Sequence, residues 1–320
     1  MGGTRMDKKR QPVIVDCDPG IDDAVALLLA ARAPELELVA VTAVAGNVGL
    51  DKTSLNARRV LTLAGVEVPV YAGAAGPMFG EQVTADEVHG ADGLLGIPAP
   101  EPAFSLGEEA AWDVIWQKAL SYGGELEIVA TGPLTNLGIA LTKYPQLPAY
   151  IKRIVLMGGA TDFGNTTPAA EYNIYADPEA ADMVFRSGIP LVVCALDVTH
   201  KAYFTQAEID RLEALGTPQA VFAAKTMGFG VEWHQKFLVP GAPMHDPCAM
   251  MYALEPELFG GVSCWMGVEC QGKHTRGKTV TDAFSDAKSP SGSNAVLVNR
   301  VDRAQFVEHL IGRLAAYGTT

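Results

Sequence analysis

The sequence predicts an α/β fold with a mainly parallel central sheet and helices on both of its faces. Short, nearly continuous apolar runs are typical of strands buried on both faces, and they recur at 12–16, 36–44, 125–130, 151–157 and 190–197. Helical patterns separate these runs, at about 22–32, 51–64, 107–122, 133–144 and 177–186. Strand and helix alternate as in a doubly wound sheet.

The individual elements are supported to different degrees. The helix at 177–186 has the clearest beginning, because Asp177 can cap it and Pro178 takes the first helical position. After about 200 the pattern loosens into helices at 205–236 and 246–254, short strands near 262–270 and 278–281, and a strand–helix pair at 295–315. We expect a flexible extension over 1–11 and a single domain over 12–320. The stretch 73–105 is long for a loop, and such loops tend to be lids or binding elements.

Composition narrows the class of protein. The 320 residues are 48% hydrophobic, which is enough for a sizeable core. The net charge of −13 disfavours a nucleic-acid or anionic-membrane partner. The sequence contains neither a membrane-length apolar run nor a secretory signal, and its five cysteines include no CxxC pair. We therefore expect a cytoplasmic protein with reduced thiols and no membrane partner.

The most informative segment is VIVDCDPGIDDAVALLLA (13–30), which places Asp16, Asp18, Asp22 and Asp23 around one strand-to-helix turn. Turn formation and helix capping explain about two of these residues. Four crowded carboxylates repel one another unless a cation is present, and open α/β sheets bind ligands at the carboxyl ends of strands. The turn therefore predicts a hard divalent cation. Oxygen ligands favour calcium or magnesium over zinc, and calcium tolerates an irregular site better.

Further polar segments follow other predicted strands or precede helices. They are ATGPLTN (130–136), MGGATDFGNTTPAAEYN (157–173) and His245-Asp246-Pro247, each of which also fits an ordinary turn or helix start. If all of them lie on the carboxyl edge of one sheet, a single crevice receives Asp18, Asp22, Asp23, Asn47, Thr131, Asn165, Glu171, Asn173 and Asp246.

Such a crevice is rich in carboxylates and amides and poor in Arg and Lys, so it suits the hydroxyl groups of a sugar. The sequence contains no GxxxxGK[ST], GxSxG or HExxH motif, which removes the usual phosphate-binding, serine-nucleophile and zinc alternatives.

The sequence resembles the inosine-uridine nucleoside hydrolases. The resemblance runs from about 12 to 315 and rests on DCDPGIDDA (16–24), AGN (45–47), ATGPLTN, LMGGA, AEYNIYADPEAA (170–181), LDVTH (196–200) and HDPCA (245–249). It implies an α/β fold, one Ca²⁺ per subunit and hydrolysis of the N-glycosidic bond of ribonucleosides to ribose and free base, in nucleoside salvage. It also implies a small-molecule ribonucleoside as partner and a homodimer or homotetramer.

The resemblance assigns roles by motif position. It implies that Asp18, Asp23, the carbonyl of Thr131 and Asp246 hold calcium, with Asp18 also acting as general base. His245 would lie beside the leaving base as its acid, and His89 in VHGADGL (88–94) matches a loop histidine. The ribose contacts would be Asp22, Asn47, the Met157 region, Asn165, Glu171 and Asn173.

The side of the site that faces the base is less defined. Phe229, Trp233 and Phe237 recur at four-residue spacing, which fits a stripe of core residues or a stacking wall over the base. We take Trp233 as the candidate base contact. Pyrimidine-specific relatives often carry Gln and Tyr at 233 and 237, so the sequence leaves the base preference open.

Two alternative functions remain. Asp16-Cys17-Asp18 resembles the D-x-D turn of aspartate-nucleophile phosphohydrolases, but these need a Lys and a Ser or Thr at later strand ends, and here a second acidic pair follows. A non-catalytic calcium-containing nucleoside- or sugar-binding module is the other alternative. An export signal would favour such a module.

Overall fold

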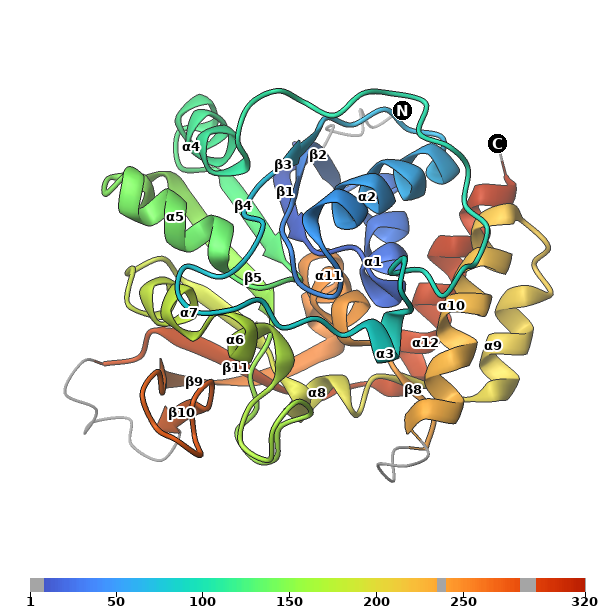
Figure 1. Ribbon diagram of the computed structural model, residues 1–320. Helices are drawn as coiled ribbons and strands as arrows, with labels where there is room; N and C mark the ends of the chain where they lie inside the picture. Colours follow the sequence, from blue (N-terminus) through green and yellow to red (C-terminus); the bar gives the residue numbers. More distant parts are fainter. Residues whose placement is uncertain (1–8, 235–239, 283–291, 320) are drawn as a thin grey trace, which may run out of the picture.

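The computed structural model describes residues 9–234, 240–282 and 292–319, and a nine-stranded sheet runs through the described chain (Figure 1). The strand order is β10-β9-β11-β6-β5-β4-β1-β2-β3. Neighbouring strands are parallel except where β9 pairs with β10 and β11. The strands are β1 Gln11–Cys17, β2 Leu36–Ala43, β3 Val70–Ala72, β4 Leu126–Ala130, β5 Ile151–Met157, β6 Leu191–Cys194, β9 Phe259–Val268, β10 Thr279–Asp282 and β11 Ala295–Val301. A small separate pair joins β7 Tyr203–Phe204 to β8 Ala242–Pro243.

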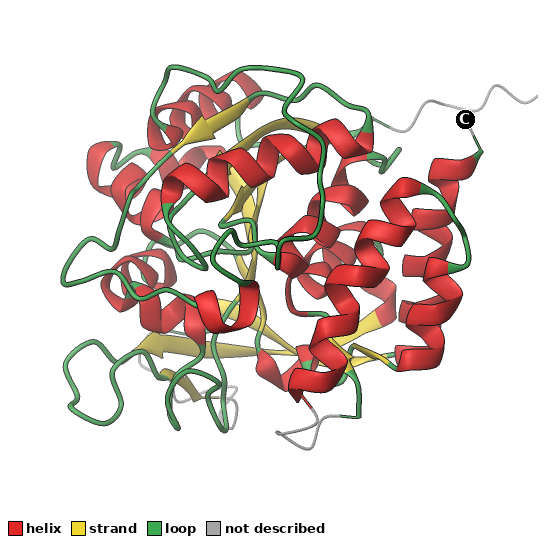
Figure 2. Ribbon diagram, turned by 45° about the vertical axis from the view of Figure 1, so that its right-hand side comes forward, coloured by secondary structure: helices red, strands yellow, loops and turns green. Residues whose placement is uncertain are grey.

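Helices cover both faces of the sheet, as predicted (Figure 2). One apolar layer contains α1 Ile21–Ala31, α2 Leu50–Ala64, α9 Gln206–Glu213, α10 Pro218–His234, α11 His245–Leu254 and α12 Arg303–Ala315. The other contains α4 Ala111–Tyr122, α5 Thr135–Lys143 and α7 Pro178–Phe185. Short elements complete the chain: α3 Asp86–His89, α6 Tyr172–Ala176, α8 Leu196–Thr199 and single 3₁₀ turns at Leu147–Tyr150, Pro256–Leu258 and Ala316–Gly318.

The first strand shows why the apolar runs predicted a sheet buried on both sides. Val13 and Val15 pack in one apolar layer and Ile14 in the other, and all three are fully buried. Successive side chains of a strand point to opposite faces, so a strand between two helical layers needs apolar residues at every position.

The site is positioned by a reversal of strand order between β1 and β4. β1 pairs with β2 on one side and β4 on the other, and the sheet then continues to β3 in one direction and to β5 and β6 in the other. Connections therefore leave the carboxyl ends of β1 and β4 toward opposite sides, which opens a crevice there.

Two predicted helices differ from the observed ones. The helix expected over 205–236 is broken into α9 and α10, because Gly216 adopts a left-handed conformation (φ 72°) and Pro218 starts a new helix. The helix expected from 107 begins at Ala111, because Gly107 is held in a bridge with Tyr71 and its N–H donates to Val70 O at 2.8 Å.

The ends of the chain add two observations. β1 begins at Gln11, the last residue of the expected extension, and residues 1–8 lie outside the described part. Among the helices that the structure describes, none is both long and apolar enough to cross a membrane.

Candidate active site

A pocket of about 780 Å³ lies at the carboxyl ends of the parallel strands. Thirteen side chains or carbonyls are predicted for the site, and ten of them line this pocket: Asp22, Asn47, His89, Thr131, Met157, Asn165, Glu171, Asn173, His245 and Asp246. Asp18 and Asp23 are fully buried and do not line it. The side chain of Trp233 lies outside the described residues, as does Phe237.

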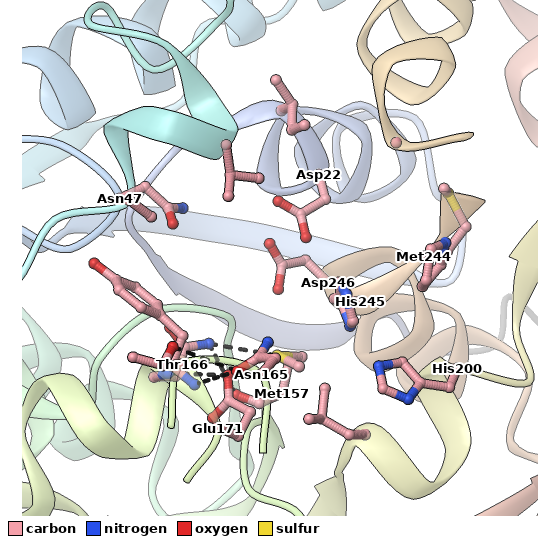
Figure 3. A pocket seen from close by; sticks show the side chains of 18 of the residues that line it. Asp22, Asn47, Met157, Asn165, Thr166, Glu171, His200, Met244, His245 and Asp246 are labelled. Carbon is pink, nitrogen blue, oxygen red and sulfur yellow. Dashed lines mark hydrogen bonds between the residues drawn. The ribbon is translucent and has the colours of Figure 1, made fainter. Parts of the chain in front are cut away.

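An acidic triplet lies at one wall of the pocket, where Asp22 and Asp246 line it. One carboxylate oxygen from each of Asp22, Asp23 and Asp246 lies within 4.8 Å of the other two. Asp22 and Asp23 come from the first turn of α1 and Asp246 from the first turn of α11, and the carboxylates of Asp22 and Asp246 point toward each other (Figure 3). The two helix starts therefore bring together acidic residues more than 200 positions apart.

Asp18 is buried beside this triplet without being part of it. Its Oδ2 accepts a hydrogen bond from the Asn47 N–H at 2.7 Å, whereas its Oδ1 has no hydrogen-bond partner among the described residues. A Cβ on Gly46 would come within 2.1 Å of Asp18 Oδ2, and one on Gly132 within 2.7 Å of Oδ1. Both loops can therefore approach this carboxylate so closely only because they carry glycine.

Asp23 both caps the start of α1 and belongs to the acidic triplet. Its Oδ2 accepts from the Gly20 N–H at the start of α1 (3.0 Å) and from Asn47 Nδ2 (3.2 Å). Its Oδ1 accepts from the Thr131 hydroxyl at 2.8 Å. Asn47 also donates through Nδ2 to Asp18 O (3.1 Å), so in this structure it organises the acidic residues.

Burial and mutual repulsion raise the pKa of these acids. Burial raises the pKa of Asp23 to about 6, with a further contribution from Asp22. The pKa values of Asp18 and Asp246 are held well above their usual range by burial and then by the neighbouring aspartates. Lys201 is the one Lys or Arg among the described lining residues, and its Nζ donates to the Asn299 carbonyl at 2.8 Å.

These observations fit a metal ion. The donors are all oxygens, they are buried except for the half-buried Asp22, they repel one another, and Asp18 Oδ1 has no partner in the described chain. A hard divalent cation would relieve that repulsion. The acidic cluster can therefore hold a metal ion.

The opposite wall is built around Glu171 and Asn173. Glu171 caps α6, accepting from the N–H groups of Asn173 (2.9 Å), Ile174 (3.2 Å) and Gly159 (2.8 Å), and burial raises its pKa to about 7 despite these donors. Asn173 Nδ2 donates to the carbonyls of Thr131 (2.7 Å) and Met157 (3.2 Å). Its Oδ1 is thereby directed away from these carbonyls as an acceptor.

Asn165, His89 and His245 are the other predicted residues that line the pocket. Asn165 is exposed, and its Oδ1 accepts from the Tyr172 N–H at 3.0 Å. His89 Nδ1 accepts from the Ile21 N–H at 3.2 Å, and burial lowers the pKa of His89 to about 4, so the ring is neutral with its hydrogen on Nε2. His245 Nδ1 lies 2.9 Å from the Thr199 hydroxyl.

Tyr172 and His200 are two of the lining residues that the predicted site does not include. Tyr172 donates its hydroxyl to the Val83 carbonyl at 2.9 Å, which joins α6 to the long loop. His200 packs edge-on against His245 with ring centroids 5.7 Å apart. Both residues lie inside the motifs AEYNIYADPEAA and LDVTH, so a systematic scan of every polar residue in those motifs could have identified them.

Comparisons with known proteins agree with this fold and identify a family. A family model described as inosine-uridine preferring nucleoside hydrolase matches residues 13–308. The pyrimidine-specific ribonucleoside hydrolases RihA of Photobacterium profundum and Salmonella schwarzengrund are 45% and 47% identical to this chain over 310 residues. Each match covers 96% of this chain and 99% of the relative.

Solved structures show the same similarity. A plant nucleoside hydrolase, PpNRh1, aligns with a TM-score of 0.91 at 33% identity, covering 96% of this chain and 100% of that chain. A purine-preferring ribonucleoside hydrolase from Gardnerella vaginalis aligns with a TM-score of 0.89 at 32% identity, covering 96% and 98%. Fold, pocket and matches together define an enzyme of the ribonucleoside hydrolase class. The chain belongs to the inosine-uridine preferring nucleoside hydrolase family.

Proposed function

We propose that this enzyme hydrolyses the N-glycosidic bond of ribonucleosides in a calcium-dependent reaction, releasing ribose and free base for nucleoside salvage. The observation that carries the proposal is the pocket itself. The half-buried Asp22 and the buried Asp246 face it from one wall, and Glu171 and Asn173 face it from the other. Such a lining suits a polyhydroxylated ligand and a cationic transition state.

Asp18, Asp23, the carbonyl of Thr131 and Asp246 would hold the calcium. All four belong to buried residues at the ends of β1 and β4 and the starts of α1 and α11, and Asp23 and Asp246 are members of the acidic triplet. When bound, calcium would supply positive charge that keeps the acids ionised and lowers the pKa of a coordinated water.

Asp18 would act as the general base. Asn47 N–H fixes one of its oxygens, and the other, Oδ1, has no partner in the described chain, so it can accept the proton of the attacking water. Asp16 would help to position Asp18. Its Oδ1 accepts from Thr42 Oγ1 and from Asn136 Nδ2 (2.8 Å), and these bonds fix the end of β1.

The pocket acids would stabilise the transition state. Departure of the base gives the ribose an oxocarbenium-like charge, and fixed carboxylates favour that charge, as they do in glycoside hydrolysis. Asp22 and Asn173 would contact the 2′,3′-diol, while Glu171 and Asn165 would contact the 5′ end. Asn47, Met157 and His89 would complete the ribose contacts.

His245 would assist the leaving base as its acid. It is the first residue of α11, directly before Asp246, and the Thr199 hydroxyl holds its Nδ1. Its place in the pocket lining beside Asp246 supports this role.

Pyrimidine ribonucleosides are the proposed preferred substrates. The two relatives at 45% and 47% identity are named pyrimidine-specific, whereas the purine-preferring structure is 32% identical. The higher identity supports a pyrimidine base. Trp233 is retained as the candidate base contact.

The test is ribose release by the purified full chain from uridine, cytidine, inosine and guanosine. We expect release that EDTA abolishes, that added Ca²⁺ restores, and that is fastest with uridine or cytidine. Ribose release unaffected by chelator would contradict calcium dependence. Binding of nucleosides without ribose release would identify a binding module instead, and faster release from inosine would contradict the pyrimidine preference.

The enzyme is proposed to act in the cytoplasm as a homodimer or homotetramer. The family resemblance supports this assembly, and sedimentation velocity of the full chain measures it. A single monomeric species across the concentration range would contradict it.

A further inference from the structure

The loop that leads from β5 to Asn165 is anchored at its beginning by side chains from distant elements. Five backbone groups, from the Ala160 N–H to the Asp162 carbonyl, bond to Lys278, Thr279 or Asp197. Most backbone groups in proteins pair with other backbone groups. Here they pair with side chains that lie 36 positions away, in Asp197, or more than 100 positions away, in Lys278 and Thr279.

Lys278 makes the largest contribution. Its Nζ donates to the carbonyls of Ala160 (3.0 Å), Thr161 (2.9 Å) and Asp162 (2.6 Å), which uses all three ammonium hydrogens. Burial lowers the pKa of Lys278, while the nearby carboxylates of Asp197 and Asp162 favour its charged form. A single cation therefore gathers three consecutive carbonyls.

Thr279 fixes the same loop at Ala160. Its hydroxyl accepts from the Ala160 N–H at 2.9 Å and donates to the Ala160 carbonyl at 2.8 Å. Gly159 is in the left-handed region (φ 81°), and a Cβ there would lie 2.7 Å from Thr279 Cγ2. The chain therefore turns tightly against β10 before it enters the loop.

Asp197, near the start of α8, holds the loop from the other side. Its Oδ2 accepts from the Thr161 N–H at 3.0 Å, and its Oδ1 accepts from the Thr161 hydroxyl. Thr161 is thus held between a carboxylate of α8 and the ammonium of Lys278. We call Lys278, Thr279 and Asp197 the loop clamp.

The part of the loop beyond the clamp is bonded mainly to its own later residues. Phe163 is 75% exposed and Asn165 is exposed, yet both line the pocket. The N–H groups of Gly164 and Asn165 donate to carbonyls of Pro168 and Ala170 within the same loop, both at 3.2 Å. The Tyr172 N–H also donates to Asn165 Oδ1 at 3.0 Å. Asn165 therefore lies between two anchors, which are residues 170–172 on one side and the clamp at 160–162 on the other.

We propose that the loop clamp, through Lys278, is a positioning device that sets the contact between Asn165 and the 5′-hydroxyl of the substrate. This inference rests on the proposed function, in which Asn165 faces the 5′ end of the ribose. Lys278 donates to the backbone of the loop and takes no part in bond cleavage.

The experiment compares uridine with 5′-deoxyuridine in wild type, Lys278→Met, Lys278→Arg and the control Lys273→Met. Lys273 is an exposed lysine of the same hairpin. In Lys278→Met we expect KM for uridine to rise about tenfold, the order of one lost hydrogen bond, with kcat within about twofold. KM for 5′-deoxyuridine should stay unchanged, Lys278→Arg should restore part of the uridine affinity, and Lys273→Met should match wild type.

Asn165→Ala separates this inference from the proposed function. If Asn165→Ala removes the preference for uridine over 5′-deoxyuridine and Lys278→Met leaves it intact, the clamp does not position Asn165. If Lys278→Met weakens both substrates equally, its role is structural and the inference is overturned. If Asn165→Ala also leaves the preference intact, the orientation of the ribose in the proposed function is wrong, and the clamp inference fails with it.

Discussion

Asp18 shows how much of the site depends on what surrounds one carboxylate. It is fully buried, and Gly46 and Gly132 approach it more closely than any residue with a Cβ could. One of its oxygens is bound by the Asn47 N–H and the other has no partner in the described chain. The neighbouring backbone thus orients Asp18 while leaving it one oxygen for a ligand or a water.

We expect Asp18→Ala to abolish turnover, because it removes a metal ligand and the base together. A positioned base alone is worth about 10²–10⁴-fold, so kcat should fall at least a hundredfold. Steady-state kinetics with uridine measure the loss, and Asp51→Ala, at an exposed position, is the control. Retention of more than about a hundredth of wild-type kcat would remove Asp18 from the proposed role.

His245 should matter for departure of the base. The Thr199 hydroxyl orients its ring, and we expect His245→Ala to slow inosine at least about tenfold while sparing a nitrophenyl riboside, whose leaving group needs no proton. Parallel kcat/KM measurements on the two substrates test this. Equal slowing of both would assign His245 a structural role.

The ribose contacts predict selection for the 2′-hydroxyl. Asp22 belongs to the acidic triplet and Asn173 is buried on the opposite wall, so a 2′-deoxynucleoside would leave polar groups in the pocket unpaired. Sites built to bind a hydroxyl reject the analogue lacking it by ~10⁴-fold or more. We expect kcat/KM for 2′-deoxyuridine to fall by that order relative to uridine. A difference within about tenfold would contradict the placement of the diol.

A 5′-phosphate should be rejected for an electrostatic reason. The proposed position of the 5′ end is beside Glu171, and the one described basic lining residue, Lys201, donates to the Asn299 carbonyl. Uridine monophosphate is the third substrate of the same comparison and should be hydrolysed far more slowly than uridine.

At the scale of elements, α6 and the loop after β3 form one unit. The Tyr172 hydroxyl donates to Val83 O at 2.9 Å, the Ala85 N–H donates to Asn47 O at 3.0 Å, and His89 accepts from Ile21 N–H. Tyr172 therefore joins the wall that contains Glu171 and Asn173 to the long loop at 73–105.

Tyr172→Phe should loosen that loop and leave the chemistry intact. We expect faster amide hydrogen exchange over residues 79–89 and a KM for uridine raised by about three- to tenfold, because one hydrogen bond is lost while the ring remains. Tyr175→Phe, in the same helix, is the control. Unchanged exchange over 79–89 would show that the hydroxyl does not hold the loop.

The same elements show what sequence could predict. The apolar strands and the acidic turn after β1 depend on local patterns, and the structure has both. The apolar periodicity continues across Gly216, so it does not reveal the break between α9 and α10. The contacts of Tyr172 and Lys278 could not be predicted, because they join segments about 90 and 120 positions apart and no local periodicity encodes such pairs.

At the scale of the whole molecule, the acidic site is a cost in stability that a cation can offset. Burial raises the pKa of Asp16 and Asp23 to about 6 and that of Glu171 to about 7, from ordinary values of 3.8 and 4.5. Each group therefore binds its proton more tightly in the folded protein than in the unfolded one. Its stabilising contribution is complete below about pH 4 and is lost as pH rises through 6 to 7.

We accordingly expect the metal-free enzyme to be more stable at about pH 5 than at about pH 8, with a Tm several degrees higher. Surface carboxylates are already ionised at pH 5. His89, whose pKa burial lowers to about 4, opposes the trend, because the unfolded chain takes up its proton below about pH 6.5. The buried acids outnumber it and therefore set the direction. Because a cation binds the ionised carboxylates, added Ca²⁺ should raise Tm more at pH 8 than at pH 5. Thermal unfolding of the full chain in chelator, and then in Ca²⁺, measures both effects.

Asp23→Asn provides the control for this prediction. The amide cannot ionise, so the metal-free variant should show a smaller fall in Tm between pH 5 and pH 8, and a smaller gain from Ca²⁺. A metal-free wild type whose Tm is highest at pH 8 would contradict the raised pKa values. A Ca²⁺ effect equal at both pH values, and unchanged in Asp23→Asn, would place the bound ion away from the buried acids.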